Sequence, residues 1–308
     1  MKKQIRILLI WVCLFAGCNE NSRMIDTPTS GEINISVDES IARIIESEVS
    51  TFQKIYPGTK INVHYKPEAE LFNDLISDSS RLIIAARKLN DDETEYFKKL
   101  EIVPSTTRIC YDAVAVIVNN KNIDTLISLN KLKGILSGKI LKWSEAGKSG
   151  NNNKIQIVYD NSSSSTLRYI RELTENQLSP NSFAVKTNPE VISYVSNNAD
   201  AVGIIGVNWI SDRDDSVTNK FLTTVRVVGI KSDLPNVDPR EYYQPYQAYI
   251  AMKYYPLIRE YYIISREAYT GLGSGFAAFV AGEKGQRIFL KSGLVPATMP
   301  VRLVETYQ

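Results

Sequence analysis

Strand-like and helix-like segments alternate along this chain from residue 31 onward. Apolar residues keep helical spacing from Ile41 to Ile55, and Pro57 and Gly58 end that pattern. Residues 61–65 then alternate between apolar and polar side chains, as a half-buried strand does. Repeated alternation of this kind is typical of α/β folds built on mostly parallel sheets. We therefore expect an α/β fold.

The same patterns predict the remaining elements. Strands are expected at 32–36, 61–65, 82–86, 111–118, 154–159, 201–207, 225–230 and 261–264. Helices are expected at 41–55, 68–76, 91–100, 129–136, 166–174 and 275–288, with polar connections at 211–219 and 231–247. Because 308 residues exceed what one core usually fills, two lobes are the natural expectation.

The first eighteen residues resemble a bacterial lipoprotein signal. A basic leader precedes an apolar run at 7–16, which is too short to cross a bilayer as a helix. Small residues then precede Cys18, which predicts that this cysteine is lipidated and becomes the new N-terminus. Leu14 stands one place early, with Phe15 at its usual position, so an ordinary cleaved signal is the alternative. Residues 19–30 are expected to form a tether.

Composition excludes several functions. A net charge of +2 offers no concentrated basic face for nucleic acid. After the signal region, Cys110 is the one remaining cysteine, and it lies in an apolar strand that predicts burial. His64 is the only histidine and falls on the polar face of a strand. We therefore expect no metal site, no cofactor and no catalytic set, and hence no enzyme.

Five segments, in order along the chain, carry a resemblance to a known family. They are residues 112–119, 135–143, 201–206, 275–287 and 291–296. Together they resemble the phosphate-type periplasmic solute-binding proteins of ABC transporters, and the likeness runs from about residue 32 to 302.

That resemblance implies a type 2-like fold of two lobes joined by crossing hinge strands. Lobe 1 would comprise residues 31–118 and 256–308, and lobe 2 residues 119–255. The protein would close on its ligand by a hinge motion and present it to an ABC permease, working as a monomer. With the lipid anchor, it would lie in the cell envelope and face the periplasm or exterior. No nucleotide-binding glycine loop is present, so the transporter would use the ATP.

Two polar loops are candidate ligand sites, because a small oxyanion is best held by N–H groups at helix starts, with hydroxyls and a guanidinium. The first follows the strand at 32–36. There Asp38 and Ser40 are candidate ligand residues, although the carboxylate would repel a fully ionised anion and would suit a ligand that carries a proton. The alternative is helix capping, since Ser36 and Glu39 have capping-box spacing.

The second loop follows the strand at 154–159. The resemblance places Ser164, Ser165 and Thr166 on the family's phosphate loop, and the ends of strands are where open α/β sheets bind ligands. Asp160 stands where the family often has arginine, so Arg168, one helical turn later, is a candidate for the missing charge. The alternative is a solvated loop that caps a helix.

Arg87 is the preferred cation, because it follows the strand at 82–86 where related proteins often carry a serine-arginine pair. An exposed surface arginine is the alternative. The leading interpretation is a receptor for phosphate or a similar oxyanion. The acidic Asp38, Glu39 and Asp160 favour a second one, a lipoprotein that keeps this fold for sensing or protein interaction without phosphate binding.

Overall fold

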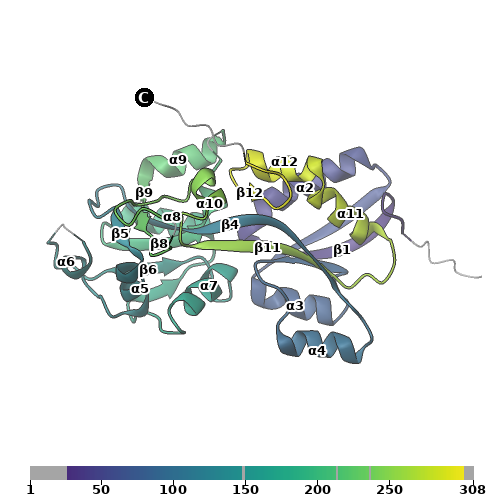
Figure 1. The fold of residues 1–308 in the computed structure, drawn as a ribbon, viewed down its shortest axis with the longest axis horizontal. Helices are drawn as coiled ribbons and strands as arrows, with labels where there is room; N and C mark the ends of the chain where they lie inside the picture. The colour runs from purple at the N-terminus through teal and green to yellow at the C-terminus, as the bar shows by residue number, and fades with distance from the viewer. Residues whose placement is uncertain (1–25, 148–149, 213, 236, 302–308) are drawn as a thin grey trace, which may run out of the picture.

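The computed structural model describes residues 26–147, 150–212, 214–235 and 237–301, which form two α/β lobes joined by crossing strands (Figure 1). The α/β fold expected from the alternation is confirmed. The leader and Cys18 lie outside the described residues. Within the described part, none of the helices has both the length and the apolar character needed to cross a bilayer.

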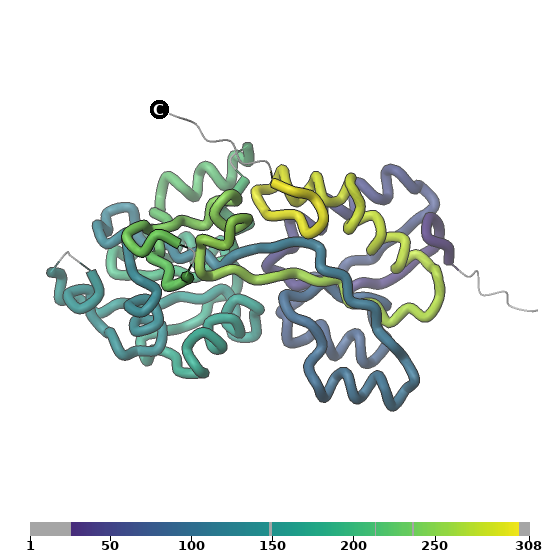
Figure 2. The backbone as a smooth tube through the Cα atoms, viewed as in Figure 1, coloured from purple at the N-terminus to yellow at the C-terminus, as the bar shows by residue number. Residues whose placement is uncertain are grey.

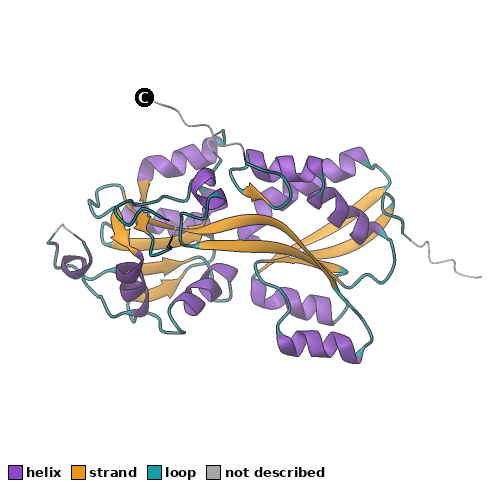
Figure 3. Ribbon diagram, in the orientation of Figure 1, coloured by secondary structure: helices purple, strands orange, loops and turns teal. Residues whose placement is uncertain are grey.

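The first lobe is a sheet with helices on both faces (Figure 3). Its elements are β1 (Gly31–Asp38), α2 (Ala42–Ile55), β2 (Thr59–Lys66), α3 (Glu68–Ile76), β3 (Leu82–Ala85), α4 (Asp91–Lys99), α11 (Leu272–Ala281), α12 (Glu283–Lys291) and β12 (Val295–Pro296). β1 pairs in parallel with β2 and β3. In β3, Leu82 and Ile84 join the main core while Ile83 and Ala85 pack with α3 and α4, so helices bury both faces.

The second lobe repeats this plan. Its elements are β5 (Leu126–Ser128), α5 (Leu129–Ser137), α6 (Trp143–Ala146), β6 (Gln156–Tyr159), α7 (Ser165–Leu173), β7 (Ser182–Ala184), α8 (Asn188–Asn197), β8 (Ala201–Gly206), α9 (Ser216–Thr224), β9 (Val225–Val227), β10 (Gly229–Lys231) and α10 (Gln247–Ala251). β6 pairs in parallel with β7 and β8. Two short 3-10 helices, η1 (Glu39–Ile41) and η2 (Val207–Trp209), follow β1 and β8.

Two long strands connect the lobes. β4 (Ser105–Asn119) and β11 (Ile258–Ser265) run antiparallel through the middle of the molecule (Figure 2). β4 also pairs with β8 of the second lobe, so a single sheet is continuous from one lobe to the other. The crossing strands expected from the resemblance are therefore present. The exact division of the chain at 118/119 and 255/256 stays a prediction.

Several element predictions were wrong in detail. α9 begins within the expected connection 211–219, where Asp215 accepts hydrogen bonds from the backbone N–H groups of Val217 and Thr218. The strand expected at 225–230 is two strands, because β9 pairs with β4 whereas β10 pairs with β5. The helix expected at 275–288 is broken at Gly282, whose backbone is extended. The helices α6, α8 and α10 and the strands β5, β7 and β12 were missed.

Candidate functional site

The loop after β1 turns its polar groups inward. Asp38 and Ser40 have no exposed surface, and Asp38 accepts hydrogen bonds from the Ser40 backbone N–H at 3.0 Å and the Ser40 hydroxyl at 2.7 Å. Asp38 thereby caps η1. The expected capping box does not form, because the Ser36 hydroxyl donates to Asp74 instead.

The loop after β6 is built in the same way. Ser164 is the N-cap of α7: its hydroxyl accepts from the Leu167 N–H at 3.1 Å and donates to Asp160 at 2.6 Å. Ser165 and Thr166 form the first turn of α7, and both are fully buried. The serine run therefore caps a helix as the alternative predicted; Ser162 and Ser163 are exposed, but Ser164 and Ser165 are buried.

The two loops meet between the lobes. The hydroxyls of Ser40 and Ser165 are hydrogen-bonded at 2.9 Å, although 125 positions separate them in the sequence. The Tyr261 hydroxyl, from β11, lies 2.7 Å from that of Ser40 and donates to Asp38 at 3.0 Å. The Asn208 side chain, from η2, donates to the Ser40 carbonyl at 2.7 Å. The structure thus brings together the two loops that the sequence singled out.

Arg259 on β11 also contacts this cluster, and the sequence analysis missed it. Its Nε donates to Asp112 on β4 at 2.7 Å, while Nη1 donates to the hydroxyls of Ser165 at 3.0 Å and Thr166 at 3.2 Å. The residue is 4% exposed. The available signal was a charged residue inside each of two apolar strands, because such residues are almost never fully buried unless paired.

The two arginines predicted as ligand cations lie in other contacts. Arg87 donates to both carboxylate oxygens of Glu93, at 2.7 and 2.8 Å, and its guanidinium lies 3.4 Å from the centre of the Phe72 ring. Arg168 forms an ion pair with Glu68 and donates to the Ala86 carbonyl at 3.1 Å. Arg168 therefore links α7 of the second lobe to the first. A ligand role for either arginine stays a prediction.

Buried carboxyl groups dominate the electrostatics of the cluster. Burial raises the pKa of both Asp112 and Asp160, which have no exposed surface. Burial, followed by repulsion from Asp160, Asp38 and Glu70, raises the pKa of Glu39 to about 7. For Arg259, burial alone would lower the pKa, but Tyr261, Asp112 and Asp38 outweigh it and raise the value. The arginine is therefore charged at neutral pH.

Other candidate chemistry falls outside this cluster. His64 is exposed on β2, and Cys110 is buried on β4, where burial raises the pKa of its thiol. Among the described residues, no three His, Cys, Asp or Glu side chains gather in a way that would hold a metal ion.

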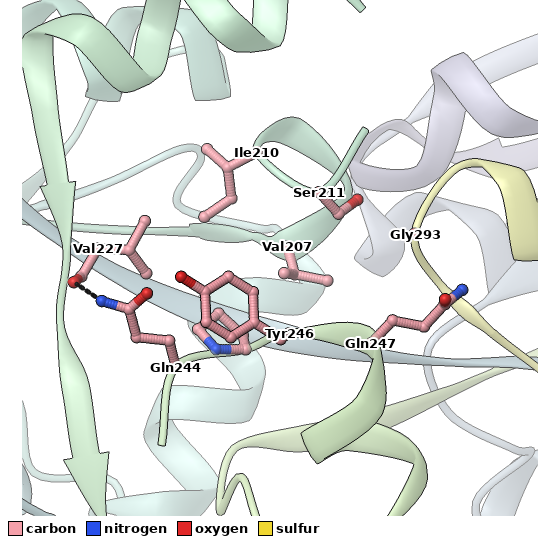
Figure 4. A pocket seen from close by; sticks show the side chains of 9 residues that line it. Val207, Ile210, Ser211, Val227, Gln244, Tyr246, Gln247 and Gly293 are labelled. Atoms are coloured by element: carbon pink, nitrogen blue, oxygen red, sulfur yellow. Dashed lines mark hydrogen bonds between the residues drawn. The ribbon is translucent and has the colours of Figure 1, made fainter. Parts of the chain in front are cut away.

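A pocket of about 220 Å³ lies between η2, β9, the segment before α10 and Gly293 (Figure 4). None of its lining residues is charged. Three of its polar side chains are already engaged: Gln244 donates to the Val227 carbonyl, Gln247 to the Leu294 carbonyl, and Ser211 to the Ser292 carbonyl. This pocket therefore offers no cation to an anionic ligand, in contrast to the cluster around Arg259.

Comparison with known proteins agrees with this architecture. A family described as the PBP superfamily domain matches residues 24–284. A phosphate-binding protein PstS of Staphylococcus epidermidis is 25% identical over 252 residues, which cover 80% of this chain and 73% of that protein. PstS of a Staphylococcus aureus strain is 25% identical over 212 residues, so the match spans 68% of this chain and 63% of that protein.

A solved structure shares the fold. It is a putative phosphate ABC transporter substrate-binding protein from Clostridium perfringens with bound phosphate, 22% identical in sequence. The superposition has a TM-score of 0.71 and covers 87% of this chain and all of the other. At this identity the likeness establishes the two-lobed fold alone.

Proposed function

Since this chain belongs to the PBP superfamily, we propose that it captures phosphate or a similar small oxyanion for an ABC importer. The Staphylococcus relatives are named phosphate-binding proteins, and the Clostridium perfringens structure holds phosphate. The Clostridium perfringens protein is also named as a substrate-binding protein of an ABC transporter, which supports a role in import.

The observation that carries the proposal is the meeting of hydroxyls from both lobes. Ser40 and Ser165 lie 2.9 Å apart, and Thr166 is next to Ser165 in the first turn of α7. The first N–H groups of a helix have no partner within the helix, and the helix dipole favours negative charge at this end. Hydroxyls and N–H groups from two lobes can surround an oxyanion that enters when the lobes separate.

The carboxylates narrow the ligand class. Asp38 and Asp160 are fully buried beside the hydroxyls, and an ionised carboxylate repels an anion that carries no proton. The same carboxylate accepts a hydrogen bond from an oxyanion that carries a proton, such as hydrogenphosphate. We therefore expect phosphate to be preferred over sulfate.

The location belongs to the same proposal. Lipidation at Cys18 would anchor the chain to a membrane of the cell envelope, and the predicted tether would let the lobes reach an ABC permease. The end of the segment predicted as tether, from residue 26 to 30, belongs to the first lobe instead, where Asp26 accepts hydrogen bonds from Arg81 and the Leu272 backbone N–H. The ligand-binding part would face the periplasm or exterior and act as a monomer. The support is the signal-like sequence at the N-terminus and the transporter relatives.

Ligand-dependent melting tests the function. The full chain in detergent is heated with phosphate, sulfate, molybdate or small carboxylates at fixed ionic strength. A ligand at about 100 times its dissociation constant should stabilise the protein by about 2.7 kcal/mol, which raises the melting temperature by a few degrees. Ser165→Ala and Thr166→Ala should abolish the shift, whereas Ser162→Ala, an exposed serine of the same loop, should keep it.

Absence of a shift with every oxyanion would overturn the phosphate assignment. The buried Asp38 and Asp160 then favour the second candidate, a lipoprotein that uses this fold for sensing or protein interaction.

A further inference from the structure

Two of the three guanidinium nitrogens of Arg259 have hydrogen-bond partners. Nε is fixed by Asp112, and Nη1 by the hydroxyls of Ser165 and Thr166. The remaining nitrogen, Nη2, is buried and has no hydrogen-bond partner. The Asp112 Oδ1 and Asn208 Oδ1 atoms are likewise buried and unpartnered. Unfilled donor and acceptor positions therefore accompany the hydroxyl cluster.

Such positions are costly without a ligand. A buried polar group that is left without a partner destabilises the protein, and a charged group does so more strongly. Native structures pair nearly all such groups, so an unpaired guanidinium N–H beside a cluster of hydroxyls indicates a ligand. The backbone agrees, because a Cβ on Gly206 would lie 2.9 Å from both Arg259 Nη2 and Asn208 Nδ2. Glycine at 206 therefore leaves room for these side chains.

The two strands that carry this pair explain its geometry. Arg259 and Asp112 are directly opposite each other in the antiparallel ladder of β11 and β4. These strands run through both lobes, so the guanidinium lies at the junction and not on a loop that moves with either lobe. In the loop after β6, Asp160 stands where the resembling family often has arginine. If Arg259 on β11 supplies the positive charge, an arginine in that loop is unnecessary.

We propose that Arg259 is the cation that binds the oxyanion, with Nη2 donating to a ligand oxygen and Asp112 as its ion-pair partner. This assignment rests on the proposed function and deepens it. It places the charge recognition on β11, whereas the sequence analysis assigned it to Arg87 and Arg168. All three guanidinium nitrogens of Arg168 have partners, and both terminal nitrogens of Arg87 donate to Glu93, whereas Arg259 Nη2 has none.

Equilibrium dialysis of the full chain in detergent with radiolabelled phosphate tests the assignment. The double variant Arg259→Gln/Asp112→Asn replaces the ion pair with two neutral amides, so no unpaired charge is buried. Phosphate binding should weaken about 10- to 100-fold, the size expected for a hydrogen bond to a charged group. Arg266→Gln is the control, because Arg266 follows the same strand but donates to the Leu75 and Ile76 carbonyls.

A second variant covers the case in which the double variant does not fold. Arg259→Lys keeps a charge beside Asp112 but loses the fork of donors, so binding should weaken about tenfold. Melting curves identify which variants are folded. Wild-type affinity in folded Arg259→Lys or in the folded double variant would overturn the assignment. Failure of the wild type to bind any oxyanion would instead overturn the proposed function, and this inference with it.

Discussion

Glu48 is a buried carboxyl group outside the candidate site. It lies on α2 with no exposed surface, and neither of its carboxylate oxygens has a hydrogen-bond partner. Burial raises its pKa to about 9, so the group is neutral in the folded protein at physiological pH. A protonated carboxyl group is tolerated in the core because it is uncharged. Ionising it would place a charge in an apolar surrounding without water, which is unfavourable.

The pH dependence of stability should report this group. The folded state keeps the proton that the unfolded chain releases near its ordinary pKa of 4.5, so stability is full below that value and falls as pH rises toward 9. Glu48→Gln should remove this fall, on the order of 3 kcal/mol between pH 5 and 8. Melting temperatures at the two pH values measure it, with Glu46→Gln, an exposed glutamate of the same helix, as control. Equal pH slopes in Glu48→Gln and the wild type would contradict the assignment.

The identity of the arginine beside the hydroxyl cluster could not be predicted from the sequence. Arg87 was favoured because it follows a strand. Glu93, six positions later, accepts hydrogen bonds from both terminal nitrogens of its guanidinium. Glu93 also completes a capping box with Asn90 at the start of α4. Arg259 was overlooked because its partner Asp112 is 147 positions away. A long-range ion pair leaves no trace in local spacing.

Local patterns were sufficient for most elements. The helices at 41–55 and 68–76 and the strand at 82–86 were predicted within one residue at each end, because hydrophobic periodicity and turn residues act over short distances. The C-terminal helix was not. Its apolar pattern continues through Gly282, but the backbone is extended there and α12 packs back against α11.

Gly285 makes that close packing possible. A Cβ at this position would lie 2.6 Å from the Val280 Cα and backbone oxygen, which cannot move as a side chain can. Gly285→Ala should therefore destabilise the protein by about 1–3 kcal/mol, as overpacking does. Gly134→Ala is the matched control, since its Cβ would meet only the Ile140 side chain. Denaturant unfolding of both variants decides, and equal stability would contradict the packing argument.

At the scale of the whole molecule, ion pairs join the lobes on two sides of the candidate site. Arg168 of α7 pairs with Glu68 of α3, and Arg43 of α2 pairs with Asp215 at the start of α9, at 2.5 Å. The Arg43 guanidinium holds the pKa of Asp215 well below its usual value. Hinge closure needs contacts that are lost when the lobes separate, and we expect ion pairs between the lobes to be lost in this way.

Removing one of these pairs should favour opening. Arg168→Gln should increase the radius of gyration of the ligand-free protein in small-angle scattering and accelerate phosphate release, because the closed state loses a partly buried ion pair. Arg287→Gln breaks an exposed pair with Glu283 inside α12 and should change neither quantity. A radius of gyration unchanged by Arg168→Gln would show that this pair does not hold the lobes together.

The amino-acid sequence is enough to predict the alternation of strands and helices, the two polar loops at strand ends and the family resemblance, because each depends on neighbouring residues. The three-dimensional fold adds that Ser40 meets Ser165, that Arg168 joins the lobes, and that the guanidinium beside the hydroxyls belongs to Arg259. These contacts form where two crossing strands bring distant segments together. The local periodicity of the sequence does not encode contacts between segments so far apart.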